Sequence, residues 1–80
     1  MTEHKIVIYS TPTCHFCVLA KAFFEAEKIP FEMKDVSTDV AAREEMVQKT
    51  GQMGVPVIDI DGTTIVGFDQ EKIKVLLGME

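Results

Sequence analysis

The amino-acid sequence predicts a single α/β domain over residues 1–80, in which a four-stranded mixed sheet is flanked by three helices in the order β-α-β-α-β-β-α. Three observations predict this fold class. A chain of 80 residues has room for one compact domain. Short apolar runs alternate along it with longer stretches of helical spacing. The last two apolar runs are joined by Asp61-Gly62, a dipeptide typical of a tight hairpin turn.

The first half of the chain is predicted to form a strand, a helix and a second strand. Residues 6–9 are a continuous apolar run, as expected for a strand that is covered on both faces. From about Cys14 to Lys28 the spacing is helical, and Pro30 prevents the helix from continuing. Apolar and charged residues then alternate over residues 31–34, which predicts a half-buried strand. The helix face expected to pack on the sheet carries Leu19, Ala22, Phe23 and Ala26.

The second half is predicted to form a helix, a hairpin and a final helix. A helix over residues 39–49 can be capped by Thr38 or Asp39 and is followed by Gly51. Strands are predicted over residues 55–60 and 63–66. Asp69 is a good N-cap for the last helix, and Phe68 and Ile73 have the spacing of a hydrophobic staple around it.

This order of elements restricts the topology. The first β-α-β unit requires parallel strands joined by a right-handed crossover. The later pair of strands is an antiparallel hairpin. A mixed sheet with helices on both faces follows, which is the minimal thioredoxin-type arrangement.

Composition and charge exclude several classes of function. A formal net charge of −5 argues against nucleic acid as a partner and against binding to anionic membranes. No apolar run approaches the length of a membrane helix, and the run after the first five residues is too short for the core of a signal peptide. We therefore expect a cytoplasmic protein without a membrane partner, and a monomer.

Both cysteines of the chain lie in one motif, Cys14-His15-Phe16-Cys17, which follows a strand and opens a helix. A Cys-x-x-Cys motif in this setting is typical of redox chemistry. The N-terminus of a helix offers unpaired N–H groups and partial positive charge, so the pKa of the Cys14 thiol should lie below the free value of about 8.5. Cys17 lies one turn further on, within reach of a sulfur bonded to Cys14. The motif predicts Cys14 as the attacking thiolate and Cys17 as the resolving thiol.

Three other interpretations of the pair remain open. A structural disulfide across so short a loop would add only about 2 kcal/mol in the chain-entropy model, and lasting disulfides are uncommon in the cytoplasm. A zinc site needs four ligands, and only His4 and His15 could join the cysteines. Both cysteines could also be buried and inert. As for the two residues inside the motif, His15 could add positive charge beside the thiolate or simply face solvent, and Phe16 is expected at the rim of the site.

Three segments together resemble the glutaredoxin family, and the resemblance covers nearly the whole chain. Residues 8–17 resemble its strand, loop and redox motif, residues 54–57 its loop with a cis proline, and residues 66–69 its segment at the last helix. The resemblance implies a thioredoxin-fold thiol–disulfide oxidoreductase of cell redox homeostasis and electron transport, which acts on disulfide-containing proteins. It implies glutathione as co-substrate, with no bound cofactor and no metal.

The resemblance also implies which residues meet the substrate. Pro56 should be cis, with its loop facing the Cys14 sulfur, and the backbone of Val55 should pair with the cysteinyl backbone of bound glutathione. Four further residues are implied to contact the two ends of glutathione. Phe68 and Asp69 would hold the γ-glutamyl end, and Lys49 and Gln52 would lie near the glycine carboxylate.

The chain departs from glutathione-using members of the family at three places. Thr11 stands where they often carry Lys, Gly54 where they usually carry Thr, and His15-Phe16 where Pro-Tyr is frequent. These changes predict a weakened glutathione site. Two alternatives follow: a redoxin-type electron carrier that thioredoxin reductase reduces, for example for ribonucleotide reductase, and an iron–sulfur module held by Cys14 of two chains and two glutathiones.

Overall fold

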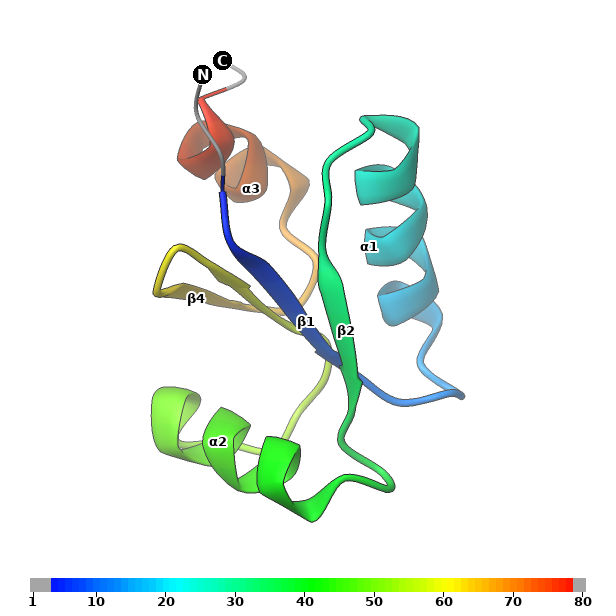
Figure 1. Ribbon diagram of the computed structural model, residues 1–80, viewed down its shortest axis with the longest axis vertical. Helices are drawn as coiled ribbons and strands as arrows, with labels where there is room; N and C mark the ends of the chain where they lie inside the picture. Colours follow the sequence, from blue (N-terminus) through cyan, green and yellow to red (C-terminus); the bar gives the residue numbers. More distant parts are fainter. Residues whose placement is uncertain (1–3, 79–80) are drawn as a thin grey trace.

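The computed structural model describes residues 4–78 and has the predicted order of elements (Figure 1). The elements are β1 (Ile6–Ser10), α1 (His15–Ala26), β2 (Glu32–Asp35), α2 (Val40–Thr50), β3 (Val57–Ile60), β4 (Thr63–Val66) and α3 (Gln70–Leu77). None of the helices in this part of the chain is long and apolar enough to cross a bilayer.

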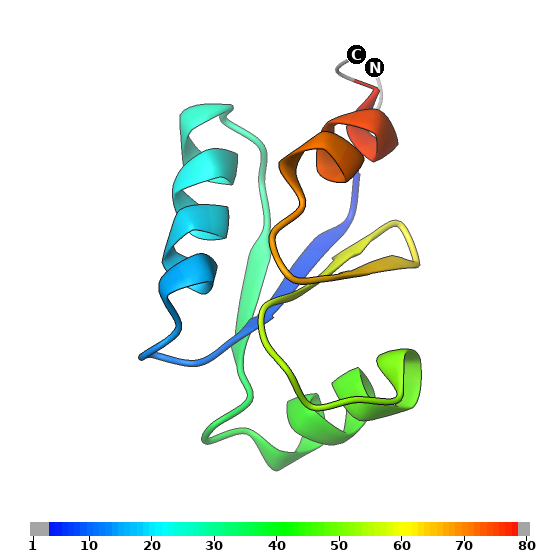
Figure 2. The same cartoon turned by 180° about the vertical axis from the view of Figure 1, so that it is seen from behind.

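The four strands form one mixed sheet in the order β2-β1-β3-β4. β1 pairs in parallel with β2 and antiparallel with β3, and β3 and β4 form an antiparallel hairpin. Figures 1 and 2 show α1 and α3 on one face of this sheet and α2 on the other. The fold is therefore the thioredoxin-like arrangement that the sequence predicts.

Alternation along the central strand divides the apolar residues into two cores. Ile6 and Ile8 face α1 and α3, where Phe24 and Ile73 are fully buried against them. Val7 and Tyr9 face the other way, toward α2, whose Met46 is buried there. Since strand side chains alternate between the two faces, this explains why residues 6–9 are apolar without interruption.

The buried face of α1 differs from the prediction. Leu19, Ala22 and Ala26 are exposed, while Phe23 is half-buried and packs against the core. The fully buried residues of the helix are Cys17, Ala20 and Phe24. Apolar residues occupy most of the circumference of this helix, so their spacing does not single out one face.

Turn and cap chemistry agrees closely with the sequence. Asp61 and Gly62 both have positive φ values, 53° and 95°, as a two-residue turn of this hairpin type requires. Asp39 caps α2 by accepting a hydrogen bond from the Ala42 N–H, and Gly51 ends that helix with a left-handed φ of 73°. β3 begins at Val57, two residues later than predicted, because Val55 and Pro56 precede the paired segment.

Candidate active site

The loop that follows β1 delivers Cys14 to the first turn of α1. Within this loop the Cys14 N–H donates to the Thr11 carbonyl at 3.2 Å. Cys14 is the N-cap of α1, and its Sγ accepts a hydrogen bond from the Cys17 N–H at 3.1 Å. The first N–H groups of a helix have no partner within the helix. The cysteine sulfur therefore takes the place that a capping oxygen occupies elsewhere.

Cys14 and Cys17 are joined by a disulfide with their Cα atoms 5.2 Å apart. The two residues differ in their access to solvent. Cys14 is partly exposed, whereas Cys17 is 2% exposed and lies on the buried face of α1. A molecule approaching from solvent therefore meets Cys14 before Cys17, and the roles of attacking and resolving thiol stay predictions.

His15 and Phe16, the residues between the cysteines, both point outward. Phe16 is 57% exposed, and its ring meets that of His15 edge to face with the centroids 5.6 Å apart. Phe16 thus lies at the rim of the site, as predicted, while an influence of His15 on the thiolate stays a prediction.

A second segment, around Val55 and Pro56, reaches the same end of the sheet. The peptide bond between these residues is cis, as the resemblance implied. Tyr9 pairs with Val57 in the antiparallel ladder, so continuing the register places Pro56 opposite Ser10, where the loop to Cys14 begins. The Pro56 carbonyl accepts a hydrogen bond from the Gly67 N–H at 2.7 Å, which fastens this segment to the one that follows β4.

The third segment enters α3. The Asp69 side chain accepts a hydrogen bond from the Lys72 N–H and caps that helix. The Phe68 ring meets the ring of Phe23 on α1 at a centroid distance of 6.0 Å. This contact joins the start of α3 to the helix that carries the cysteine pair.

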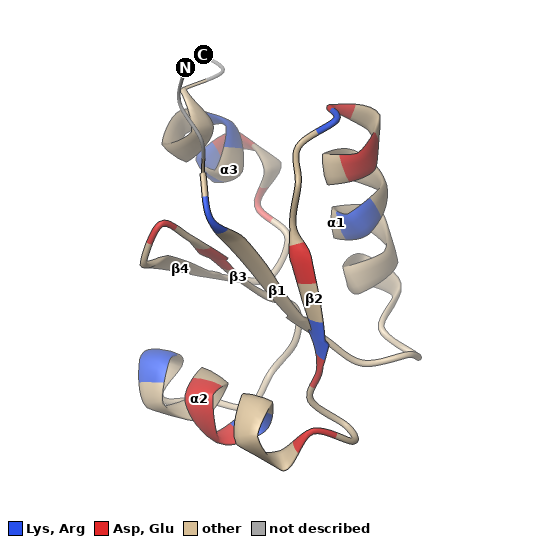
Figure 3. Cartoon of the chain, in the orientation of Figure 1, with Lys and Arg blue, Asp and Glu red and all other residues tan. Residues whose placement is uncertain are grey.

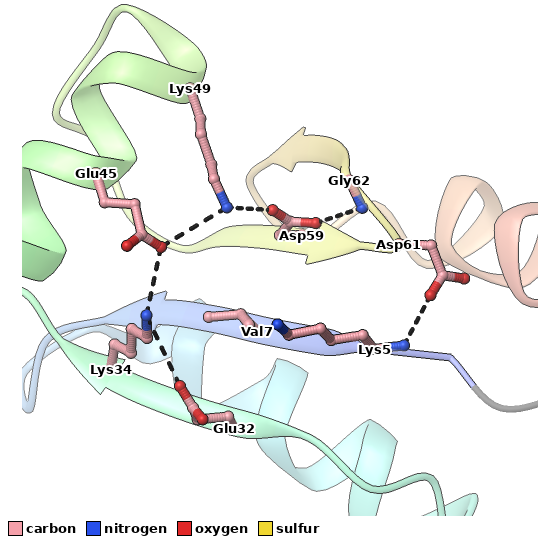
Figure 4. A pocket seen from close by; sticks show the side chains of 9 residues that line it. All are labelled: Lys5, Val7, Glu32, Lys34, Glu45, Lys49, Asp59, Asp61 and Gly62. Atoms are coloured by element: carbon pink, nitrogen blue, oxygen red, sulfur yellow. Dashed lines mark hydrogen bonds and ion pairs between the residues drawn. The ribbon is translucent and has the colours of Figure 1, made fainter.

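Lys49 belongs to a different cluster, on the face of the sheet that α2 covers. Its Nζ lies 2.6 Å from a carboxylate oxygen of Asp59 and 3.3 Å from the Tyr9 hydroxyl. The hydrogen bond to Asp59 raises the pKa of Lys49 well above its usual value. Figure 4 shows this ion pair at the edge of a cavity of about 380 Å³. None of the other residues predicted to bind glutathione lines this cavity.

The family resemblance placed Lys49 near the glycine carboxylate of glutathione, and the sequence analysis missed Asp59 as its partner. Asp59 is buried, with 8% of its side chain exposed, in the otherwise apolar strand β3. A carboxylate in such a strand is costly to bury unless it is paired. The charge within the run 57–60 was therefore a signal that a cation would lie beside it.

Gln52 also has partners within the chain. Its side-chain oxygen accepts from the Gly54 N–H, and its side-chain nitrogen donates to the Gly54 carbonyl at 3.1 Å. Thr11 carries an uncharged side chain, and its carbonyl accepts the Cys14 N–H in the loop before α1. The structure thus gathers Thr11, Val55, Pro56, Phe68 and Asp69 around one end of the sheet.

Around Cys14 and Pro56, residues 10–20 and 50–58 carry no Lys, Arg, Asp or Glu. Asp69 brings a carboxylate to the same end of the sheet, at the start of α3. Figure 3 shows the loop before α1 and the start of that helix free of charged residues. Within residues 4–78 the structure contains no group of three or more His, Cys, Asp or Glu side chains that could hold a metal ion.

A disulfide-forming pair at the first turn of a helix, on a thioredoxin-like sheet, defines a thiol–disulfide oxidoreductase. The family model for glutaredoxin matches residues 6–65. The chain belongs to the glutaredoxin family.

Individual relatives agree with this assignment. The chain is 46% identical over 72 residues to an uncharacterized glutaredoxin-like 8.6 kDa protein in a rubredoxin operon of Clostridium pasteurianum, covering 90% of this chain and 96% of that protein. It is 36% identical over 64 residues to glutaredoxin 3 of Escherichia coli K12, covering 80% and 77%.

Solved structures agree as well. The thioredoxin-like protein BC3987 superimposes with a TM-score of 0.85 at 35% identity, covering 90% of this chain and 99% of that one. A buckwheat glutaredoxin–glutathione complex superimposes with a TM-score of 0.73 at 26% identity, covering 94% and 71%.

Proposed function

We propose that this protein reduces protein disulfides and glutathione mixed disulfides in the cytoplasm, as a monomer, with glutathione as its co-substrate. The observation that carries the proposal is the asymmetry of the cysteine pair. Cys14 is partly exposed and its sulfur accepts the Cys17 N–H, while Cys17 is buried one turn behind it. An accessible sulfur at a helix N-terminus is suited to act as a thiolate.

The reaction proceeds by two exchanges at Cys14. In the first, the Cys14 thiolate attacks one sulfur of the substrate disulfide, and the other sulfur leaves as a thiolate. In the second, the Cys17 thiol loses its proton and attacks the Cys14 sulfur. This releases the bound thiol and leaves the Cys14–Cys17 disulfide. Two molecules of glutathione then supply the two electrons that regenerate the dithiol and become glutathione disulfide.

Two of the three contacts expected for glutathione have candidates beside the cysteine pair. The backbone of Val55 can pair with the cysteinyl part. At the start of α3, the Asp69 carboxylate can face the α-ammonium group, and free N–H groups can face the α-carboxylate. A similar protein, the buckwheat glutaredoxin, is known in complex with glutathione, which supports the same co-substrate here.

The third contact, to the glycine carboxylate, lacks a free cation. Thr11 is uncharged, Lys49 is paired with Asp59, and the Gln52 amide is bonded to Gly54. An exposed ion pair contributes only about 0–1 kcal/mol, so its loss weakens glutathione binding without abolishing it. We therefore expect measurable but low glutathione-dependent activity.

The pairing of Lys49 also favours a second candidate function. A carrier reduced directly by thioredoxin reductase needs no glutathione carboxylate site, and residues 10–20 and 50–58 contain no Lys or Arg for one. In that case the surface around Cys14 would meet the reductase and a disulfide-containing partner protein such as ribonucleotide reductase.

One experiment separates the two candidates. The oxidised protein is mixed either with glutathione plus glutathione reductase or with thioredoxin reductase, and the consumption of NADPH is followed. Reduction by dithiothreitol serves as a control that the oxidised protein can be reduced. Reduction by the glutathione couple supports the proposal. Rapid reduction by thioredoxin reductase without any response to glutathione replaces it with the carrier function.

A further inference from the structure

The Gln52 side chain folds back over the backbone of Gly54. Its Oε1 accepts the Gly54 N–H at 2.5 Å, and its Nε2 donates to the Gly54 carbonyl at 3.1 Å. The Nε2 atom also lies 3.4 Å from the hydroxyl of Thr50, the last residue of α2. One amide group therefore satisfies both backbone groups of a single residue and ties it to the end of α2.

Gly54 is matched to this arrangement. A Cβ atom built on Gly54 would lie 2.6 Å from the Gln52 Oε1, closer than real contacts allow. Gly54 does not have the left-handed φ that favours glycine elsewhere in the chain. Among the described residues other than its chain neighbours, only Gln52 lies within 4 Å of this Cβ position, so a side chain at Gly54 would have to displace the Gln52 amide.

The hydrogen bond to the Gly54 carbonyl also orients the next amide. The Gly54–Val55 peptide bond is trans, so its C=O and N–H point in opposite directions. Gln52 holds the carbonyl and thereby turns the Val55 N–H away from itself. Among residues 4–78, neither the Val55 N–H nor its C=O has a hydrogen-bond partner. The register of β1 and β3 places this free edge beside the loop that leads to Cys14.

We propose that Gln52 is a positioning residue that fixes the Val55 backbone for substrates carrying peptide groups next to their disulfide. Gln52 acts through the Gly54 peptide and does not touch the reacting sulfur atoms. The proposal rests on the thiol–disulfide exchange at Cys14 and on the pairing of the substrate with Val55 under the proposed function. It does not depend on glutathione as the reductant.

The test compares two disulfides in single-turnover reactions with the pre-reduced protein. The disulfide of N-acetylcysteine amide carries peptide groups beside its sulfur atoms, and bis(2-hydroxyethyl) disulfide carries none. The half-saturating concentration and the limiting rate are measured for Gln52→Ala and for Gln48→Ala. The second variant removes an exposed glutamine from α2 and serves as the matched control.

Gln52→Ala should raise the half-saturating concentration for the peptide disulfide about two- to tenfold, the range for one neutral hydrogen bond. The limiting rate and the reaction with bis(2-hydroxyethyl) disulfide should stay unchanged, and Gln48→Ala should behave as the parent protein. An equal loss with both disulfides would assign Gln52 a general structural role. No change with either disulfide would show that binding of the substrate does not depend on the Val55 backbone that Gln52 positions. Both results overturn the proposal.

A double-mutant cycle with Gly54→Ala provides a second, independent readout. In the parent protein the new Cβ displaces the Gln52 amide, so Gly54→Ala alone should reproduce the effect of Gln52→Ala. The Gln52→Ala variant has no Oε1 atom for the new Cβ to overlap. In that variant, Gly54→Ala should therefore cause no further rise in the half-saturating concentration. Additive effects of the two changes would show that Gln52 and Gly54 act separately and would contradict the proposal. Because this assay contains no glutathione, its result can be interpreted even if glutathione is not the reductant.

Discussion

The two sulfur atoms of the redox pair have different surroundings, although only two residues separate them in the chain. Cys14 caps α1 and accepts a backbone N–H, while Cys17 packs against the core. In the reduced protein, negative charge on Cys14 is stabilised by the helix N-terminus, whereas Cys17 would have to ionise in an apolar setting. The thiols should therefore ionise in the order Cys14, then Cys17.

Replacing either cysteine should reveal these roles. Cys14→Ser should abolish all activity, because no other accessible thiol exists in the chain. Cys17→Ser should keep the attack on a glutathione mixed disulfide, which needs one protein thiol, and lose most of its activity on protein disulfides. Turnover with both substrates is measured, with circular dichroism as a control for folding. An equal and complete loss of activity in both variants on the glutathione substrate would contradict the assignment of Cys14 as attacking and Cys17 as resolving thiol.

Thr11→Lys should strengthen glutathione binding. The new ammonium group would face the glycine carboxylate, while the Thr11 carbonyl that holds the Cys14 N–H is unaffected. An exposed ion pair of about 0–1 kcal/mol corresponds to a KM for glutathione substrates that falls up to about fivefold, with little change in kcat. Steady-state kinetics at low ionic strength measure this, and Thr11→Met provides a control of similar length without charge. An equal gain in both variants would argue against an electrostatic cause.

The secondary-structure elements differ in how they are attached to the sheet. α2 contributes only two fully buried side chains, Ala42 and Met46. It is fastened in addition by polar contacts: Lys49 pairs with Asp59 of β3, and Glu45 bonds to the Tyr9 hydroxyl and to Lys34. Hydrogen bonding from Tyr9 is the main reason that the pKa of Glu45 is lowered. α2 therefore depends on charged groups more than α1 does.

Lys49→Met should destabilise the protein by about 1–3 kcal/mol, because it leaves the buried Asp59 carboxylate without a cation. The expected cost is below the 3–5 kcal/mol typical of fully buried pairs, since 37% of the Lys49 side chain is exposed. Urea unfolding at neutral pH measures it. Lys21→Met, at an exposed position of α1, is the matched control, and equal stability of the two variants would contradict the role of the pair.

Local signals allowed most of the element boundaries to be predicted from the sequence. Asp39, Asp69, Gly51 and the Asp61-Gly62 turn act through their own backbone or their nearest neighbours, so a single chain segment reveals them. The buried face of α1 was predicted wrongly, because Leu19 and its apolar neighbours surround the helix and only tertiary packing selects Ala20 and Phe24.

In the site, too, features set by local sequence could be predicted and features set by tertiary contacts could not. Cys14 and Cys17 follow from their spacing, and the cis bond before Pro56 followed from the family resemblance. The pairing of Lys49 with Asp59 joins different elements, and the fold of Gln52 over Gly54 depends on one side-chain conformation. The charge of Asp59 in an apolar run signals that a cation lies nearby but does not say which one, and nothing in the sequence signals the fold of Gln52 over Gly54.

For the molecule as a whole, the titrating groups predict how stability depends on pH. Hydrogen bonds lower the pKa values of Glu45, of the half-buried Asp35 and of the exposed Asp61 in the folded state. Their contribution is present above the unfolded values near 4 and is lost as pH falls through the lower folded values. The raised pKa of Lys49 acts in the opposite direction: its contribution is present below the unfolded value of about 10.4 and is lost as pH rises toward the folded value.

We therefore expect a plateau of stability between about pH 5 and pH 9, with losses on both sides. Urea unfolding midpoints from pH 2 to pH 11 measure the profile, and the Lys49→Met variant should lose part of the alkaline slope. A midpoint that stays constant from about pH 5 down to pH 2 would show that the carboxylates gain nothing from their partners on folding.

The placement of charge has a consequence for the speed of encounter. The segment that carries Cys14, residues 10–20, has no Lys, Arg, Asp or Glu, but the whole chain carries a net charge of −5, and a disulfide approaching from a distance senses that total first. At about 0.01 M salt the electrostatic screening length is about 30 Å, and at 0.15 M it shrinks to about 8 Å. Glutathione disulfide, an anion, should therefore react faster with the reduced protein as salt is added, whereas bis(2-hydroxyethyl) disulfide should react at one rate throughout. Stopped-flow measurements at the two ionic strengths compare these substrates, and a rate for the anion that falls with salt would reveal a local attraction to the site strong enough to exceed the repulsion of the whole molecule.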